Sequence, residues 1–166
     1  MSDVKDEVIR LAQKGYQEVV LTGIHLSSYG VDFKDSDHNL LSLIQSIHQV
    51  DGITRIRLGS LEPRIITEEF VQTLSGLWKV CPHFHLSLQS GCQETLERMN
   101  RRYTADEYRE KCQILRKYYE NPALTTDVIV GFPQESLEEF RESYEFVKEI
   151  QFYETHIFKY SRRHGT

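Results

Sequence analysis

The alternation of strand-like and helix-like segments constrains the fold of this 166-residue chain more than any other feature. Several of the short apolar runs carry apolar residues on both faces, as strands do in a parallel sheet covered by helices. We predict five strands, at residues 18–21, 53–58, 84–88, 126–130 and 155–160. Strict alternation of this kind favours parallel strands joined by right-handed helical crossovers.

Helical patterns of apolar residues fill the intervals between these strands. Two of the helices are expected to begin with a capping box, which pairs Thr104 with Glu107 and Ser136 with Glu139. A short extra helix is expected at residues 93–99. The predicted order is therefore α, β, α, β, α, β, α, α, β, α, β.

The number of strands points to an incomplete barrel. The chain opens on a helix with no strand before it and closes on a strand with no helix after it. A complete eight-stranded barrel needs about 250 residues. We therefore expect residues 1–166 to form one α/β domain, either a partial (β/α) barrel of about five parallel strands that lacks its first strand or an open sheet.

Charge and cysteine content narrow the classes of function. The net charge of −5 and the pI near 5.8 argue against a surface dominated by nucleic-acid binding, although a local basic patch stays possible. No apolar run approaches the roughly 20 residues of a membrane span, and the charged start is not a secretory signal. We expect a cytoplasmic protein with no membrane partner. Cys81, Cys92 and Cys112 lack the spacing of a metal-ligand set, so we expect them to be structural or incidental.

Glycine and polar residues follow the predicted strands, at the edge where parallel α/β proteins bind ligands. Glu62, Gln89 and Ser90 should converge on one mouth, which suits a polar ligand with amine, hydroxyl and ring groups. Composition leaves two interpretations open, since loops also need glycine simply to turn. His25 ends the first strand and is the histidine that we expect nearest a ligand. His83 and His85 alternate on one strand, where either a metal pair or structural histidines would account for them.

Six strings are similar to the radical S-adenosylmethionine (SAM) core of the methylthiotransferases. Each is weak alone, but together they follow the family order over about 145 residues. The GIHL and SLEP variants most resemble the branch that modifies threonylcarbamoyladenosine in tRNA. The strings are LTGIHLSSYG (21–30), RIRLGSLEP (55–63), HLSLQSG (85–91), LERMNRRYT (96–104), TDVIVGFPQES (126–136) and FKYSRRHGT (158–166).

This resemblance implies a radical SAM barrel and an enzyme that inserts a methylthio group into adenosine of tRNA. Family members bind SAM and hold a [4Fe–4S] cluster through CxxxCxxC, because cluster iron needs cysteine thiolates. A second cluster lies in an N-terminal domain, and a small C-terminal domain helps to hold RNA. No CxxxCxxC occurs here. We therefore expect a fragment of the core that lacks both domains and is inactive alone.

The resemblance also implies a set of SAM-binding residues at the strand ends. Gly23 and Ile24 are expected at the methionine moiety, and Glu62 at the amino or ribose groups. Gln89 and Ser90 are expected at the ribose and Arg102 at the carboxylate. Val130 and Gly131 are expected at the adenine.

Two groups of basic residues are candidates for contact with tRNA. Arg98, Arg101 and Arg102 form one group, and residues 162–164 form the other. Solvated loop charges would account equally well for Arg98 and Arg101. Alternatives to the whole interpretation are a relative that modifies a ribosomal protein, a non-catalytic module that binds SAM or RNA, and a fragment with no ligand. The sequence does not predict the oligomeric state.

Overall fold

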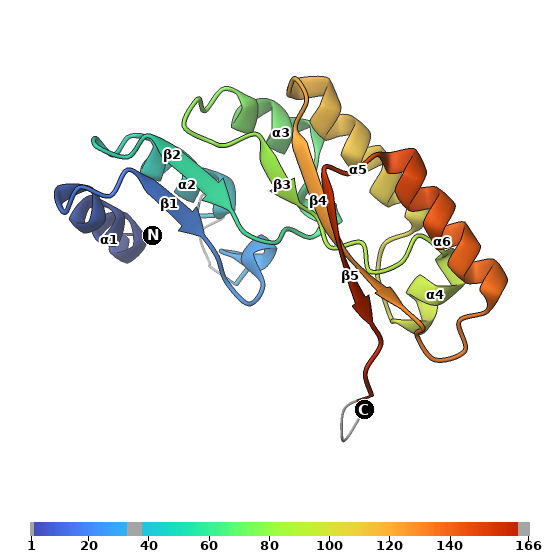
Figure 1. The fold of residues 1–166 in the computed structure, drawn as a ribbon. Coiled ribbons are helices and arrows are strands. Elements are labelled where there is room, and N and C mark those ends of the chain that lie inside the picture. Colours follow the sequence, from blue (N-terminus) through green and yellow to red (C-terminus); the bar gives the residue numbers. More distant parts are fainter. Residues whose placement is uncertain (1, 33–37, 163–166) are drawn as a thin grey trace.

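The computed structural model describes residues 2–32 and 38–162, and it has the predicted alternation of helices and strands (Figure 1). The strands are β1 (Glu18–Leu21), β2 (Arg55–Leu58), β3 (His83–His85), β4 (Ala123–Val130) and β5 (Glu154–Lys159). The helices are α1 (Ser2–Gln13), α2 (Leu40–His48), α3 (Glu68–Ser75), α4 (Gln93–Arg98), α5 (Ala105–Tyr118) and α6 (Leu137–Ile150). Short 3-10 turns follow β1 and β2, at Leu26–Ser28 and Pro63–Ile65.

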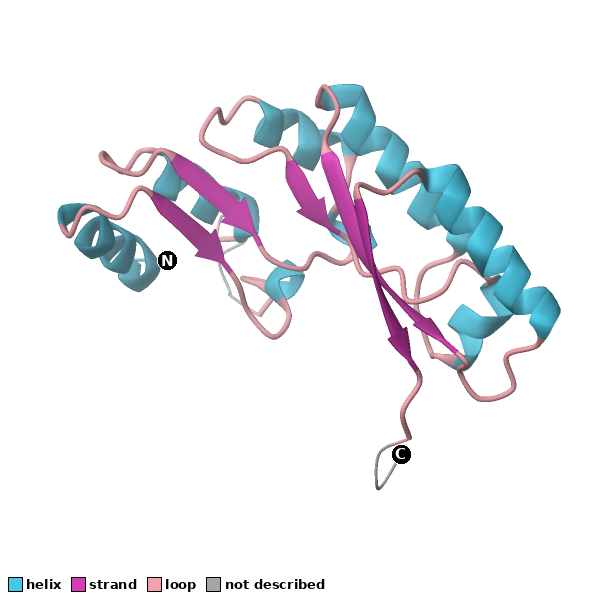
Figure 2. Ribbon diagram, viewed as in Figure 1, coloured by secondary structure: helices cyan, strands magenta, loops and turns pink. Residues whose placement is uncertain are grey.

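All strand pairs in the described ranges are parallel. β1 pairs with β2, and β3, β4 and β5 form a second sheet in that order. Isolated parallel bridges from Ile56 to Val80 and from Leu61 to Leu86 join the two sheets. The strands curve as one open layer with helices packed along one side, and they do not close into a barrel (Figure 2).

The third strand is shorter than the sequence predicts. Regular pairing ends at His85, although the predicted strand continued to residue 88. Beyond it the backbone still follows β4, but through isolated contacts: Leu88 N–H donates to the Thr126 hydroxyl, and Gln89 N–H donates to the Asp127 carbonyl. Gln89 has a φ of 69°, a left-handed conformation that ends the extended backbone.

The core lies between the strands and the helices. Strand residues of alternate parity, such as Ile56 and Phe84, are fully buried against helix residues such as Ile44, Leu74 and Tyr108. Residues of the other parity face away from the helices. They are largely polar or charged and include Glu18, Arg57, His85, Asp127 and His156. The uncovered face of the strands is therefore chemically different from the face that the helices cover.

Helix starts follow the predicted capping signals. The Thr104 and Ser136 side chains accept hydrogen bonds from the backbone N–H of Glu107 and Glu139, and both capping boxes are complete. These caps fix the starts of α5 and α6 close to the carboxyl ends of the strands. Across the described ranges, no helix has the length and apolar character that crossing a bilayer requires.

A candidate ligand site at the carboxyl ends of the strands

The strands β1 to β5 of the described residues all run toward the same edge of the molecule, so the loops that follow them share that edge (Figure 1). The first contact between these loops joins the ends of β1 and β2. His25 Nε2 lies 2.7 Å from Glu62 Oε1, and the Glu62 N–H donates to the Ser27 hydroxyl over 2.9 Å. The half-exposed His25–Glu62 pair therefore fixes the direction of the carboxylate at the candidate site.

A cavity of about 310 Å³ opens beside this pair. Three guanidinium groups and one carboxylate line it, which gives it a positive balance suited to an anionic or zwitterionic ligand. Its lining residues come from the loops after β1 and β2 and from the α4–α5 connection: His25, Glu62, Arg64, Asn100, Arg101, Arg102 and Tyr103. The structure thus brings together Glu62 and Arg102 of the predicted set.

Tyr103 connects this cavity to the residues that follow β3. Its hydroxyl donates to the carbonyls of Ser87 and Leu88, over 2.8 Å and 2.7 Å. Burial raises the pKa of Tyr103 to about 12, with the nearby Glu62 charge acting in the same direction and Arg101 opposing it. The hydroxyl therefore stays protonated and holds the backbone that leads into Gln89.

Gln89 and Ser90 occupy different environments. Gln89 is half-buried, and its backbone is tied to β4 by hydrogen bonds with Asp127 and Ile129. Ser90 is fully buried, where its hydroxyl accepts from the Cys92 N–H over 3.2 Å and lies 3.5 Å from the Ser143 hydroxyl of α6. The Ser90 side chain is thus engaged in the β3–α4 connection.

The remaining predicted residues lie along the same edge at either side. Gly131 has a φ of +72°, and its N–H donates to Glu135 Oε2 over 2.5 Å, so β4 ends in a tight turn directly after the half-buried Val130. A Cβ added at Gly23 would meet no heavy atom closer than 3.9 Å, and Ile24 has a relative exposure of 109%. Gly23 and Ile24 therefore leave the β1 end open to an approaching group.

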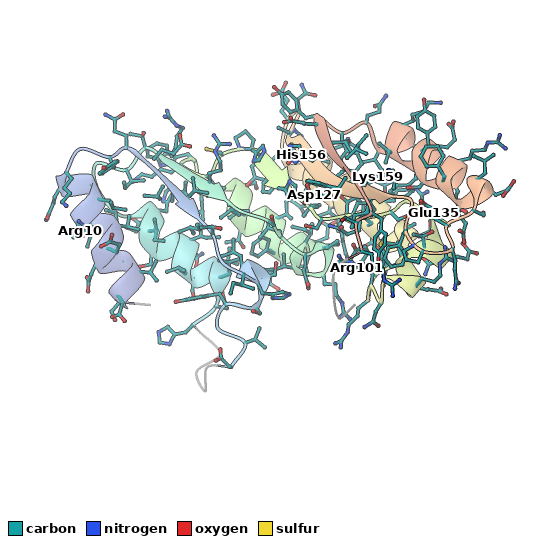
Figure 3. The ribbon with its side chains drawn as sticks, turned by 60° about the horizontal axis from the view of Figure 1, so that its bottom comes forward. Arg10, Arg101, Asp127, Glu135, His156 and Lys159 are labelled. Atoms are coloured by element: carbon teal, nitrogen blue, oxygen red, sulfur yellow. The ribbon has the colours of Figure 1, made fainter. Side chains whose placement is uncertain are left out.

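The basic residues predicted to contact tRNA have different environments in the structure. Arg98 is bound to Glu139 by two hydrogen bonds of 2.8 Å, which join α4 to α6. Arg101 and Arg102 line the cavity instead, and Figure 3 shows Arg101 at the front edge of the molecule. Arg162 is exposed, whereas Arg163 and His164 lie outside the described residues.

The three cysteines do not fit an iron–sulfur cluster. Neither group of potential metal ligands found in the described ranges contains more than one cysteine. Burial raises the pKa of Cys92 to about 11 and that of Cys112 to about 12, which keeps both thiols protonated. Cluster binding needs thiolates, which these buried, protonated thiols do not provide.

These features define a class of α/β protein, in which an open layer of parallel strands has a polar ligand site at its carboxyl edge. The model of the Radical SAM superfamily matches residues 1–147. The chain therefore belongs to the radical SAM superfamily, and the predicted fold class is confirmed.

Solved structures share this fold. The radical S-adenosylmethionine methyltransferase TsrM from Kitasatospora setae superposes with a TM-score of 0.73 at 19% identity, covering 95% of this chain and 30% of that one. Coproporphyrinogen III oxidase (HemN) from Escherichia coli also gives a TM-score of 0.73, at 14% identity, covering 98% of this chain and 37% of that one. At such identities the likeness concerns the fold alone.

Sequence relatives confirm the resemblance to methylthiotransferases. Threonylcarbamoyladenosine tRNA methylthiotransferase MtaB of Bacillus subtilis (strain 168) is 44% identical over 97% of this chain and 36% of its own length. A tRNA-2-methylthio-N(6)-dimethylallyladenosine synthase of Thermoanaerobacter sp. (strain X514) is 40% identical over 99% of this chain and 35% of its own length. The chain thus spans about a third of the curated relatives that it matches.

Sequence reasoning missed the role of Tyr103 and the participation of Arg64 and Asn100. All three lie within or next to the strings that resemble the family, but their chemistry depends on how the α4–α5 connection packs against the loops after β1 and β2 and the residues that follow β3. A tyrosine directly after two arginines, in a loop between two helices, was the available signal.

Proposed function

We propose that this chain is the core segment of a tRNA methylthiotransferase that uses SAM to insert a methylthio group into an adenosine of tRNA. The observation that supports it most is the 44% identity to the B. subtilis enzyme over nearly the whole chain. The 44% identity to the corresponding enzyme of Aquifex aeolicus, over 98% of the chain, favours threonylcarbamoyladenosine as the modified base.

In this proposal the strand-end residues bind and orient SAM. Glu62, held by His25, accepts a hydrogen bond from the amino group or the ribose hydroxyls. Arg102 lies in the same cavity and pairs with the SAM carboxylate, for which a guanidinium is well suited.

The ends of β3 and β4 take the nucleoside part of SAM. Gln89 offers its amide to the ribose, and the space around Gly131, where a Cβ would meet nothing within 4 Å, lets backbone lie against adenine beside Val130. Gly23 and Ile24 border the methionine moiety. The Ser90 hydroxyl is already bonded inside the molecule, so among these residues it carries the weakest case for a direct contact.

The bound cofactors of this family supply radical chemistry at a C–H bond of adenosine. The cysteines of this chain do not fit a cluster, so in this proposal the cluster ligands come from elsewhere in the parent polypeptide and residues 1–166 alone are inactive. The contribution of this chain is to orient SAM and to shape the surface that receives tRNA.

Arginines at the ligand edge form the tRNA-facing surface in this proposal. Arg64 and Arg101 line the cavity, and the exposed Arg162 follows β5 at the same edge. Contacts of this kind fix the position of a nucleic acid through its phosphates without reading its sequence. Arg98 is not part of this tRNA-facing surface, because its guanidinium is hydrogen-bonded to Glu139.

A chimaera tests this function. The segment of B. subtilis MtaB that aligns with this chain is replaced by residues 1–166, and the chimaera is expressed in a strain that lacks its own enzyme. We expect mass spectrometry of tRNA nucleosides to detect methylthiolated threonylcarbamoyladenosine. Glu62→Ala in the chimaera should abolish most of the product.

Glu120→Ala serves as the matched control. Glu120 is an exposed glutamate between α5 and β4, at the opposite edge of the sheet, and its replacement should leave the product level unchanged. A chimaera that folds and carries its clusters but forms no methylthiolated nucleoside would refute the proposed function.

A further inference from the structure

A second polar cluster lies on the uncovered face of the sheet and shares no residue with the cavity beside Glu62. Asp127 of β4 and His156 of β5 are register partners, and Figure 3 shows them side by side on adjacent strands. His85 of β3 is the register partner of Thr125, two residues before Asp127 on the same face of β4. Three neighbouring strands therefore present His85, Asp127 and His156 to one point.

Asp127 lies between the two imidazoles. Its Oδ2 is 3.4 Å from His85 Nε2, and its Oδ1 is 3.2 Å from His156 Nδ1. The two imidazole rings are stacked, with centroids 5.9 Å apart and an interplanar angle of 23°. One ligand atom from each residue lies within 4.8 Å of the others. Ligands bonded to one tetrahedral ion at about 2.0–2.2 Å are separated from each other by about 3.3–3.6 Å, so only small movements would be needed.

The outer nitrogens of both imidazoles also have polar partners. His85 Nδ1 lies 3.0 Å from the hydroxyl of the buried Thr125, and His156 Nε2 lies 3.5 Å from Glu154 Oε1. Metal-binding histidines typically use the second ring nitrogen in this way, since such a partner fixes the tautomer and the ring orientation. Both inner nitrogens are thereby directed toward Asp127.

We propose that His85, Asp127 and His156 form a binding site for a divalent first-row transition metal ion of the zinc class. Two imidazoles and one carboxylate suit Zn²⁺, Fe²⁺, Co²⁺ or Ni²⁺, whereas Ca²⁺ and Mg²⁺ prefer oxygen ligands alone. The ion would cross-link β3, β4 and β5. The exposed side of His156 leaves room for a water molecule or another group as the fourth ligand.

The other group of potential metal ligands is a weaker candidate. It consists of Cys92, Glu94 and Glu142, and the Cys92 thiol donates a hydrogen bond to Glu94 over 3.2 Å. The raised pKa of this buried thiol keeps it protonated, and a protonated thiol is a poor ligand. The histidine site needs no deprotonated thiol, so it is the site that the geometry favours.

Zinc binding to the metal-free 166-residue chain tests the proposal. Competition with a chromophoric chelator measures stoichiometry and affinity, and Co²⁺ absorption reports the ligand set. We expect one equivalent of Zn²⁺ and a melting temperature that rises with zinc. Asp127→Asn and His156→Gln should each lower the affinity by about 100-fold or more. Thr125→Val, which removes only the partner of His85, should lower it by about 10-fold to 100-fold.

Two matched variants control for other sites. His48→Gln removes a histidine of α2 that packs against Trp78, and Cys92→Ser removes the competing thiol. Both should bind zinc as the unchanged chain does. Circular dichroism checks folding, and His156→Gln on the edge strand decides the result if Asp127→Asn fails to fold. Absence of zinc binding, binding that survives Asp127→Asn and His156→Gln, or binding that depends on Cys92 would each overturn the proposal.

Discussion

Tyr103 shows how one side chain links two parts of the ligand edge. Its ring is buried beside the cavity, and its hydroxyl hydrogen-bonds to the consecutive carbonyls of Ser87 and Leu88, just after β3. We predict that Tyr103→Phe lowers the free energy of unfolding by about 1–2 kcal/mol, because buried carbonyls lose a donor. Urea denaturation measures the change. An unchanged unfolding midpoint would show that these carbonyls do not depend on the hydroxyl.

Gly91 is a residue whose lack of a side chain matters for packing. A Cβ at this position would lie 2.6 Å from the Cβ of the buried Phe146 on α6. We predict that Gly91→Ala lowers the free energy of unfolding by about 1–3 kcal/mol through overpacking. Gly23→Ala is the matched control, since its Cβ would meet nothing closer than 3.9 Å and should change stability little. Equal stability of the two variants would contradict this account of α6 packing.

At the scale of elements, the Arg98–Glu139 contact joins α4 to the start of α6. The Arg98 hydrogen bond, followed by that from the Ser136 backbone, lowers the pKa of Glu139 from its ordinary value. A carboxyl group whose folded-state pKa is depressed contributes stability above its unfolded-state pKa and loses it as pH falls through the folded-state value. The contribution should therefore be present at neutral pH and disappear in acid.

We predict that the stability difference between the unchanged chain and Glu139→Gln is fully present at neutral pH and shrinks in acid, as pH falls below the ordinary glutamate pKa of about 4.3. Thermal melts across a pH series measure it. Glu120→Gln, an exposed change in the connection between α5 and β4, provides the comparison. A difference that stays constant from neutral to acidic pH would contradict the ion-pair explanation.

The sequence predicted these elements well where local signals agreed with the tertiary structure. Apolar periodicity and the capping boxes at Thr104 and Ser136 located the helices, because both signals are local. The strand prediction was wrong at residues 86–88, where β propensity continues but regular strand pairing has ended. Strand pairing is a property of two chain segments, so no single run of residues reveals where it stops.

The candidate sites could be predicted only in part for the same reason. Polar residues after strands indicated Glu62, but the cavity also needs the α4–α5 connection to fold back over it. Alternation showed that His83 and His85 share a face. The partners of His85 come from β4 and β5, and only the strand register brings Asp127 and His156 beside it. Register follows from long-range packing, which a single sequence does not show.

At the scale of the whole molecule, one open layer of strands carries two distinct sets of polar residues. The carboxyl edge carries the charged cavity and the loops assigned to SAM, whereas the uncovered face carries the histidine–aspartate cluster. Helices pack on the other face and supply the core. This division lets changes at the ligand edge be tested without removing the packing that holds the fold.

Isothermal titration calorimetry of SAM against the 166-residue chain tests the central claim most directly. We predict weak but measurable binding, because the proposal gives the strand-end residues contacts with SAM whereas these residues do not supply the cluster of the family. Each charge-assisted hydrogen bond contributes about 1.5–3 kcal/mol. Glu62→Ala should therefore weaken binding by about 10-fold to 150-fold, Gln89→Ala should weaken it less, and Glu120→Ala should leave it unchanged. No detectable binding, or binding that neither Glu62→Ala nor Gln89→Ala weakens, would contradict the assignment of SAM to the carboxyl edge.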